Sequence, residues 1–162
     1  MIKVKGFTRE DIDEAVAVWN RVVEDGCAFP QEIPFTREQG IEFFESQTFT
    51  GVAYDDETGE IVGVYIMHPN FVGRCSHICN TSYAVKAGKR GMGIGSIIVT
   101  HSMEKARECG FKILQLNAVI ASNTPALNLY KKLGLIPLGA IKDAFRNKNG
   151  EYEDIIPHYI NL

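Results

Sequence analysis

Three glycines within five residues stand where an apolar helix is expected to begin. In the stretch VKAGKRGMGIGSII, residues 85–98, Gly91, Gly93 and Gly95 follow two cations. A glycine inside a helix costs roughly 1 kcal/mol relative to alanine, so backbone rather than side chain is needed here. The first turn of a helix has free N–H groups and a positive dipole end, and glycines let a phosphate approach them closely. The stretch therefore favours a pyrophosphate cradle, and a strand-to-helix turn without a ligand is the alternative.

Two other nucleotide-binding motifs are excluded by their spacing. A P-loop needs a Lys-Ser or Lys-Thr pair after its glycines, and none follows here. A dinucleotide fingerprint needs G-x-G-x-x-G and an acid that closes the next strand. The spacing here is G-x-G-x-G, and the expected strand FKILQLNAVI ends without an acid.

Alternation and helical spacing predict a mixed α/β fold with a central sheet of about seven strands and about four helices. Short hairpins make antiparallel pairs, and one helical crossover allows a single parallel pair. The expected order is β-α-α-β-β-β-α-β-α-β-β, in one α+β domain over residues 1–162. Expected strands cover 2–7, 48–55, 60–68, 76–85, 111–120, 135–146 and 151–162, and expected helices run from 8 to 26, onward from 36, over 93–109 and over 122–134.

Composition disfavours several classes of function. The chain has 45% apolar and 23% charged residues with a net charge of −3, which is typical of a globular protein and disfavours nucleic acid as a partner. No apolar run approaches the roughly 20 residues of a membrane span, and the N-terminus lacks a signal-peptide pattern, so we expect a cytoplasmic protein without a membrane partner. Cys75, His77 and Cys79 would share one face of a strand, but no second ligand pair follows, so no metal is expected.

Two motifs at matching spacing resemble the GNAT superfamily of acetyl-CoA-dependent N-acetyltransferases. Residues 90–95, RGMGIG, resemble its pyrophosphate signature. About 30 residues later, NTPALNLYKKLGL is similar to its Asn-to-Tyr helix motif, with Asn123, Tyr130 and Gly134 in place and Leu135 for the usual Phe. Ala87 stands where the family commonly has Pro. The order of elements also matches over nearly the whole chain.

This resemblance implies acetyl-CoA as co-substrate. Backbone groups near Tyr83 and Val85 should pair with its pantetheine arm, and Asn123 should bond the same arm. Tyr130 should lie near the thioester sulfur, although a packing role for its ring is the alternative. The pyrophosphate should be held at the helix entry by Arg90, Gly91, Met92, Gly93, Ile94, Gly95 and Ser96.

The chemistry of amide formation assigns roles to some of these residues and leaves one open. The N–H of Val85 can stabilise an oxyanion, and Tyr130 can protonate the leaving thiolate. In the family the base is often a Glu on the strand before the cradle, but SHICNTSYAV has no carboxylate. His77 is the nearest titratable candidate. A water chain held by Asn80 and Thr81 is the alternative.

The acceptor is predicted to be a small amino-acid-like amine. The N-terminal half resembles the phosphinothricin-type branch, and two strands resemble fungal enzymes that acetylate azetidine-2-carboxylate and other proline analogues. By that resemblance Asn80 and Asn117 hold a carboxylate, although each could instead bond backbone where the strands part. Phe29 and Phe35 are expected to be apolar walls. A polyamine, an aminoglycoside or a protein N-terminus is the alternative acceptor, and a non-catalytic acyl-CoA-binding module is the alternative function. A homodimer is common in these branches.

Overall fold

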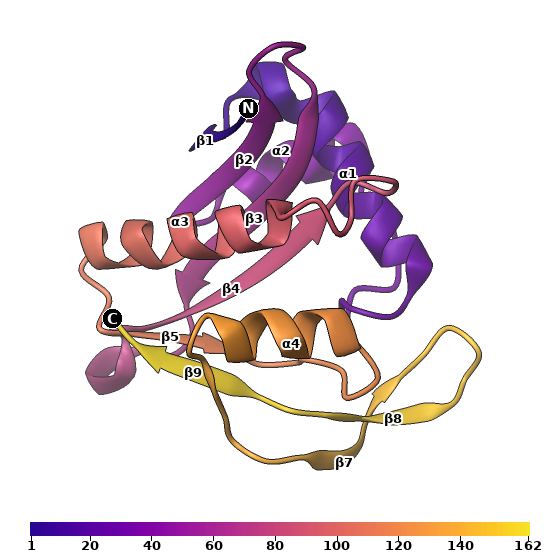
Figure 1. Cartoon of the computed structure of the whole chain (residues 1–162), viewed down its shortest axis with the longest axis vertical. Coiled ribbons are helices and arrows are strands. Elements are labelled where there is room, and N and C mark those ends of the chain that lie inside the picture. The colour runs from indigo at the N-terminus through magenta and orange to yellow at the C-terminus, as the bar shows by residue number, and fades with distance from the viewer.

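A computed structural model describes all 162 residues and confirms the expected order of elements. Seven strands form one mixed sheet in the order β1-β2-β3-β4-β5-β9-β6 (Figure 1). Only β4 and β5 are parallel, because α3 crosses between them. The elements are β1 (Ile2–Gly6), α1 (Ile12–Asp25), α2 (Arg37–Glu45), β2 (Phe49–Asp55), β3 (Ile61–Pro69), β4 (Ile78–Val85), α3 (Ile94–Glu108), β5 (Ile113–Leu116), α4 (Thr124–Lys132), β6 (Ile136–Pro137), β7 (Ile141–Arg146), β8 (Tyr152–Ile155) and β9 (His158–Asn161).

Helices cover both faces of the sheet. Alternate residues of β3 point to opposite faces. Val64 and Ile66 belong to one apolar cluster together with the buried stripe of α1 and Phe44 of α2. Tyr65 and Met67 belong to a second cluster with α3, and α4 packs its partly buried side against it. Figure 1 shows α3 and α4 in front of the sheet. The α1–α2 face and the α3–α4 face are named in this way below.

Local sequence signals explain where the first helices begin and end. Thr36 caps α2 in a capping box. Its hydroxyl accepts from the N–H of Gln39 at 3.2 Å, and its own N–H donates to the side-chain oxygen of Gln39 at 2.9 Å. Gly26 ends α1 in the left-handed conformation, with φ of 64°. The sequence predicts both boundaries correctly.

The expected strands at the C-terminus are each broken in two. Gly139 adopts a φ of 94°, and Pro157 has no N–H to donate to a ladder. Both breaks therefore interrupt continuous pairing. As a result β6 and β9 join the main sheet, whereas β7 and β8 form a separate two-stranded sheet. The expected strand over 111–120 also ends early, at Leu116.

The expected cysteine face does not exist. β4 begins at Ile78, and Cys75 lies in a short 3-10 turn that starts at Gly73, where φ is 58°. Cys75 and His77 are exposed, whereas Cys79 is buried. No group of three or more His, Cys, Asp or Glu side chains could hold a metal ion. No helix is long and apolar enough to cross a membrane.

Candidate active site

The sheet opens between its two parallel strands. β4 and β5 pair only from Ile78 to Asn80 and from Ile113 to Gln115. Beyond this last rung the two strands diverge, and Figure 1 shows β4 and β5 fanning apart. We call this opening the splay.

The edge of β4 that faces the splay has unused backbone groups. Asn70 donates to the carbonyl of Ile78 at 2.8 Å, and Lys86 donates to Val62 at 2.9 Å, so the even-numbered residues of β4 bond to β3. Alternation turns the N–H and C=O groups of Thr81, Tyr83 and Val85 the other way. The rung between Asn80 and Gln115 uses the N–H of Thr81, so Tyr83 and Val85 are the residues that keep both groups free. These groups face the splay, where β5 no longer runs alongside. They are available to an extended ligand arm and to a developing oxyanion.

The start of α3 lies just beyond the end of β4. Its N-cap is Gly93, with φ of 81°, and no side chain caps the helix. The first turn contains no acidic residue. Gly91 also has a positive φ of 80°, and the space where its Cβ would stand is open, as it is at Gly93. Free N–H groups, a positive dipole end and open backbone fit the pyrophosphate of acetyl-CoA.

Gly95 serves a different purpose from its two neighbours. It lies inside α3 with an ordinary φ, and a Cβ there would stand 3.1 Å from Cδ2 of Leu129 on α4. Its absence of a side chain therefore permits the close approach of α4 to the start of α3. Ile94 is buried below the loop, whereas Met92 is exposed. Ser96 is partly exposed on the first turn.

The cations beside this loop are engaged with carboxylates. Arg90 pairs with Asp25 at the end of α1, at 3.1 Å, and Lys89 pairs with Glu60 at 3.2 Å. Lys86 shares Glu60 at 2.8 Å, and these pairs hold the pKa of Glu60 below its usual range. Arg90 is exposed and the two lysines are partly exposed, so each ion pair contributes little. The phosphate-binding capacity of the loop therefore lies mainly in its backbone.

Helix α4 supplies the two polar residues of the second motif. Asn123 caps the helix, because its side-chain oxygen accepts from the N–H of Ala126 at 3.4 Å. Tyr130 packs against the α3–α4 cluster, and its ring centroid lies 5.7 Å from that of His158. Burial raises the pKa of Tyr130 to about 12. Its hydroxyl bonds no protein group and stays protonated at neutral pH, as a proton donor must.

A cavity of about 510 Å³ lies on the α1–α2 face. This volume suits a small molecule. Phe29 stacks on Trp19 with ring centroids 4.4 Å apart, and both rings line it. Phe35 does not line it; the ring packs behind Phe43 at 4.8 Å instead. The lining consists of Trp19, Phe29, Pro30, Gln31, Phe43, Ser46, Gln47, Ile66, His68 and Ser82.

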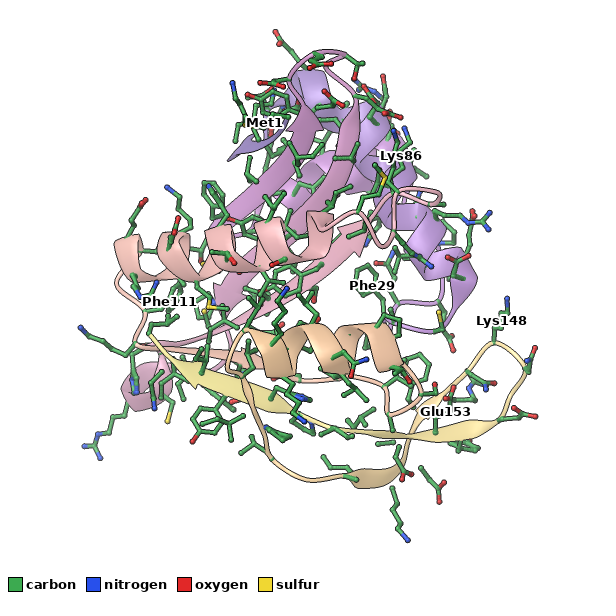
Figure 2. All side chains as sticks on the ribbon, in the orientation of Figure 1. Met1, Phe29, Lys86, Phe111, Lys148 and Glu153 are labelled. Carbon is green, nitrogen blue, oxygen red and sulfur yellow. The ribbon has the colours of Figure 1, made fainter.

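The loop that contributes Phe29 is tied down at both ends. The Asn20 side chain bonds both the N–H and the C=O of Phe35 at 2.8 Å. Near the other end, Gly26 is covered by the side chain of Lys148, which lies at the tip of the β7–β8 hairpin. Figure 2 shows Lys148 and Phe29 on the side toward which β4 and β5 diverge. The loop and the hairpin therefore meet beside the open end of the splay.

Four amide side chains form a row where the splay begins. Asn80 donates to the carbonyl of Gln115 at 3.1 Å, across the last rung between β4 and β5. The Gln115 side chain donates to Asn117, which pairs with Asn70 through two hydrogen bonds. We call Asn70, Asn80, Gln115 and Asn117 the amide row. Asn80 thus makes the backbone bond that the sequence left as an alternative, and Asn117 is exposed beside it.

The structure does not support His77 as a base. His77 precedes β4, its side chain is exposed, and its carbonyl accepts from Lys112 at 2.9 Å where β5 begins. It lies beyond the paired end of the strands, four residues or about 13 Å of extended chain from Thr81, the first residue past the last rung. The prediction that the strand includes His77 is therefore wrong, because β4 begins at Ile78.

Several residues that line the cavity are not predicted from the sequence. His68 and Ser82 lie on neighbouring strands, and Gln47 follows α2. The available signal was the alternation of β3, which puts His68 on the same face as Ile66. No local motif marks these residues, because they come from separate parts of the chain.

Comparisons with known proteins agree with this arrangement. N-acetyltransferase aca1 from Schizosaccharomyces pombe is 33% identical over 147 residues, which cover 82% of this chain and 70% of that protein. A GCN5-related N-acetyltransferase from Kribbella flavida has a TM-score of 0.91 at 26% identity, covering 99% of this chain and 98% of that one.

A third protein has the same fold with the cofactor bound. A phosphinothricin acetyltransferase from Sinorhizobium meliloti, solved in complex with acetyl-CoA, has a TM-score of 0.91 at 18% identity and covers 99% of this chain and 88% of that one. The model of the acetyltransferase (GNAT) family matches residues 16–135. With the splay, the free edge of β4 and the open start of α3, this match shows that the chain belongs to the GNAT family of acetyl-CoA-dependent N-acetyltransferases.

Proposed function

We propose that the protein transfers the acetyl group of acetyl-CoA to the amine of a small amino-acid-like acceptor, by direct attack in a ternary complex. The observation that carries the proposal is the cavity of about 510 Å³ on the opposite face of the splay from Tyr130. A small acceptor in this cavity can approach the thioester through the splay while the cofactor stays bound along β4.

The lining of the cavity favours a small acceptor over a polycation. It contains no Asp or Glu, and a polyamine or an aminoglycoside would need such carboxylates to balance its charges. The side-chain oxygen of Gln47 is buried without a hydrogen-bond partner. A buried acceptor of this kind gains from a donor, and the N–H of an amine supplies one. Trp19, Phe29 and Phe43 suit an apolar body.

A carboxylate on the acceptor fits the amide row. Asn80 and Asn117 each retain one amide hydrogen beyond those used within the row. A neutral amide that donates to a carboxylate makes a charge-assisted bond. Because the row crosses the start of the splay, a bound carboxylate would leave the amine near the thioester. This geometry supports an α-amino or α-imino acid.

On the cofactor side, backbone and Tyr130 share the work. The N–H groups of Tyr83 and Val85 face the splay, and they can donate to the pantetheine arm and to the oxygen of the thioester carbonyl as it becomes negative. Tyr130, protonated at neutral pH, can donate to the sulfur as the C–S bond breaks. Asn123 retains its N–H groups for the pantetheine arm, because only its oxygen is used in the cap.

A thiol-release assay with acetyl-CoA tests the proposal. The acceptors are azetidine-2-carboxylate, phosphinothricin and L-alanine, with azetidine and ethylamine as controls that lack the carboxylate. Spermidine, kanamycin and a short peptide represent the other acceptor classes. We expect turnover of at least one of the three acids and much less with the controls. Tight CoA binding without any turnover would instead indicate an acyl-CoA-binding module.

Two further expectations concern assembly and location. We retain the homodimer and the cytoplasm as predictions taken from the branches that the sequence resembles. Sedimentation velocity on the purified protein tests the first, and cell fractionation tests the second.

A further inference from the structure

The cavity on the α1–α2 face contains a single titratable side chain, His68 at the end of β3. The other lining residues, from α1, the 26–35 loop, α2 and its following turn, β3 and β4, are aromatic, aliphatic, amide or hydroxyl side chains and one proline. An acceptor amine enters mostly as an ammonium ion, and it must lose a proton before it can attack. Within this cavity only His68 can take it.

The hydrogen bond of His68 fixes which ring nitrogen is free. Its Nδ1 lies 2.9 Å from the carbonyl oxygen of Pro69. A carbonyl can only accept, so Nδ1 carries the hydrogen, and in the neutral ring Nε2 then has the lone pair. A backbone carbonyl thus holds the tautomer and orientation that a base needs. The ring is partly exposed, so a proton can leave to solvent.

The position of His68 in the sheet brings this base near the reacting amine. His68 is paired with Asn80 in the β3–β4 ladder, and Asn80 is paired with Gln115 across the last rung before the splay. Directly paired residues share a face, and adjacent strands are about 4.8 Å apart. His68 therefore stands one strand from the start of the splay, on the face of the sheet that holds the cavity.

The other candidates are less well placed. His77 lies outside β4 and is exposed. His158 is buried against Tyr130 on the α3–α4 face, and its Nδ1 bonds the carbonyl of Ile156 at 2.6 Å. His101 bonds the hydroxyl of Tyr65 on that same side. None of them lines the acceptor cavity.

We propose that His68 is the general base of the reaction. Nε2 takes one proton from the acceptor ammonium, directly or through a single water, and the amine lone pair forms the new bond to the acetyl carbon. The C–S bond then breaks and the thiolate takes one proton from Tyr130. The amine nitrogen loses its second proton, which returns to Tyr130 through solvent, and His68 releases the first proton to solvent. The sum is R–NH3⁺ + acetyl-S-CoA → R–NH–acetyl + HS-CoA + H⁺. This inference rests on the proposed function.

The test compares the pH dependence of kcat/KM in the wild type and in His68→Gln, using whichever of the three acids the wild type acetylates. A protonated imidazole has no lone pair, so the wild-type rate should fall as the pH is lowered. His68→Gln should lose about 10²–10⁴-fold in kcat at neutral pH, together with this His-dependent acidic limb. Its affinity for CoA by calorimetry should be unchanged.

Two further variants separate proton transfer from structure. Adding imidazole should restore activity to His68→Ala, because a free base can enter the vacated space. His77→Gln tests the rival histidine. The inference is overturned if His68→Gln keeps the wild-type rate and pH profile, if imidazole restores nothing, or if the deficit appears in His77→Gln instead. If the wild type acetylates none of the three acids, the proposed function fails first.

Discussion

The two ends of the proposed active site present different kinds of groups to their ligands. On the cofactor side the ligand-facing groups are mainly backbone: the odd-numbered residues of β4, and the first turn of α3 with its glycine cap. On the acceptor side they are side chains from α1, a loop, α2, β3 and β4. The cofactor side therefore depends on the path of the main chain, and the acceptor side depends on the identity of individual residues.

This difference explains what each end can recognise. Backbone N–H groups at a helix start bind any pyrophosphate, and they need little besides the correct φ angles. Aromatic walls and a few polar groups select one size and shape of molecule. Substitutions on the two sides should consequently have different effects. Those near the cavity should change which acceptors are used, and those near the start of α3 should change the affinity for the cofactor.

The largest expected effect is that of replacing Tyr130, a side chain on the side of the site where backbone groups predominate. Tyr130 is the one side chain on the cofactor side that we expect to take part in chemistry. Tyr130→Phe should lower kcat by about 10²–10⁴-fold, because the leaving thiolate loses its acid. Its CoA affinity, measured by calorimetry, should stay near the wild-type value. Tyr152→Phe is the matched control, because Tyr152 on β8 has an exposed side chain. A wild-type kcat in Tyr130→Phe would make Tyr130 a packing residue.

The pH profile gives Tyr130 a second readout. An acid acts only while it is protonated, and burial raises the pKa of Tyr130 from 10.0 to about 12. The activity should therefore not begin to fall near pH 10 through loss of this proton. In a spectroscopic pH titration, the difference between the wild type and Tyr130→Phe gives the phenolate absorbance of Tyr130. This absorbance should appear only well above pH 10.

The next largest effect tests the acceptor side. A charge-assisted bond is worth roughly 1.5–3 kcal/mol, so Asn80→Ala should raise KM for azetidine-2-carboxylate about 10–150-fold. The KM for azetidine, which lacks the carboxylate, should change much less. Asn117→Ala should behave in the same way. Equal losses on both acceptors would mean that the amide row shapes the splay rather than binds the carboxylate.

A smaller effect tests the backbone cradle. A side chain at a left-handed position costs about 1–3 kcal/mol, so Gly93→Val should weaken CoA binding about 5–150-fold if that cost falls on the bound loop. Gly59→Val is the control, because Gly59 has a similar φ of 77° and equally open surroundings in the β2–β3 turn. Thermal melts report whether both variants fold. Unchanged CoA affinity in folded Gly93→Val would contradict a cradle at this residue.

The smallest effect concerns the cation beside the cradle. Exposed ion pairs are worth about 0.2–1 kcal/mol, so Arg90→Gln should weaken CoA binding by at most about fivefold. Asp25→Asn should free Arg90 and tighten binding by a similar factor at low salt, and added salt should remove the difference. A much larger loss in Arg90→Gln would show that a side chain, rather than backbone, holds the phosphate.

The sequence predicts the local backbone structure on the proposed cofactor side, because the signals for it are local. Gly91 and Gly93 allow positive φ angles in their own loop, and Asn123 caps the helix that follows it. A short stretch of sequence therefore contains both the signal and the structure that it predicts. The same holds for the helix boundaries at Thr36 and Gly26. The acceptor side is different, because His68, Gln47 and Ser82 meet only when three elements pack together. Phe35 was expected in the cavity, but a window of sequence cannot tell a lining ring from the ring behind it.

The errors at the C-terminus have a related cause. Residues 135–146 and 151–162 alternate like two long strands, and Gly139 and Pro157 are the only marks of the breaks. Whether such a strand continues depends on which partner lies beside it. Here the main sheet takes β6 and β9, and the remaining segments pair with each other as β7 and β8. A similar competition places His77 outside β4. The 3-10 turn that begins at Gly73 takes up residues that alternate like a strand, so β4 begins only at Ile78.

The unpaired edge of β4 has a consequence for how this enzyme tolerates sequence change. The N–H and C=O groups of Tyr83 and Val85 belong to the main chain, so replacing one of these side chains leaves the hydrogen-bonding group in place. Of the twenty amino acids only proline removes the N–H. Most single substitutions at these positions therefore leave the ligand-facing backbone groups intact. New acceptor preferences can accumulate around the cavity while the acetyl donor stays the same.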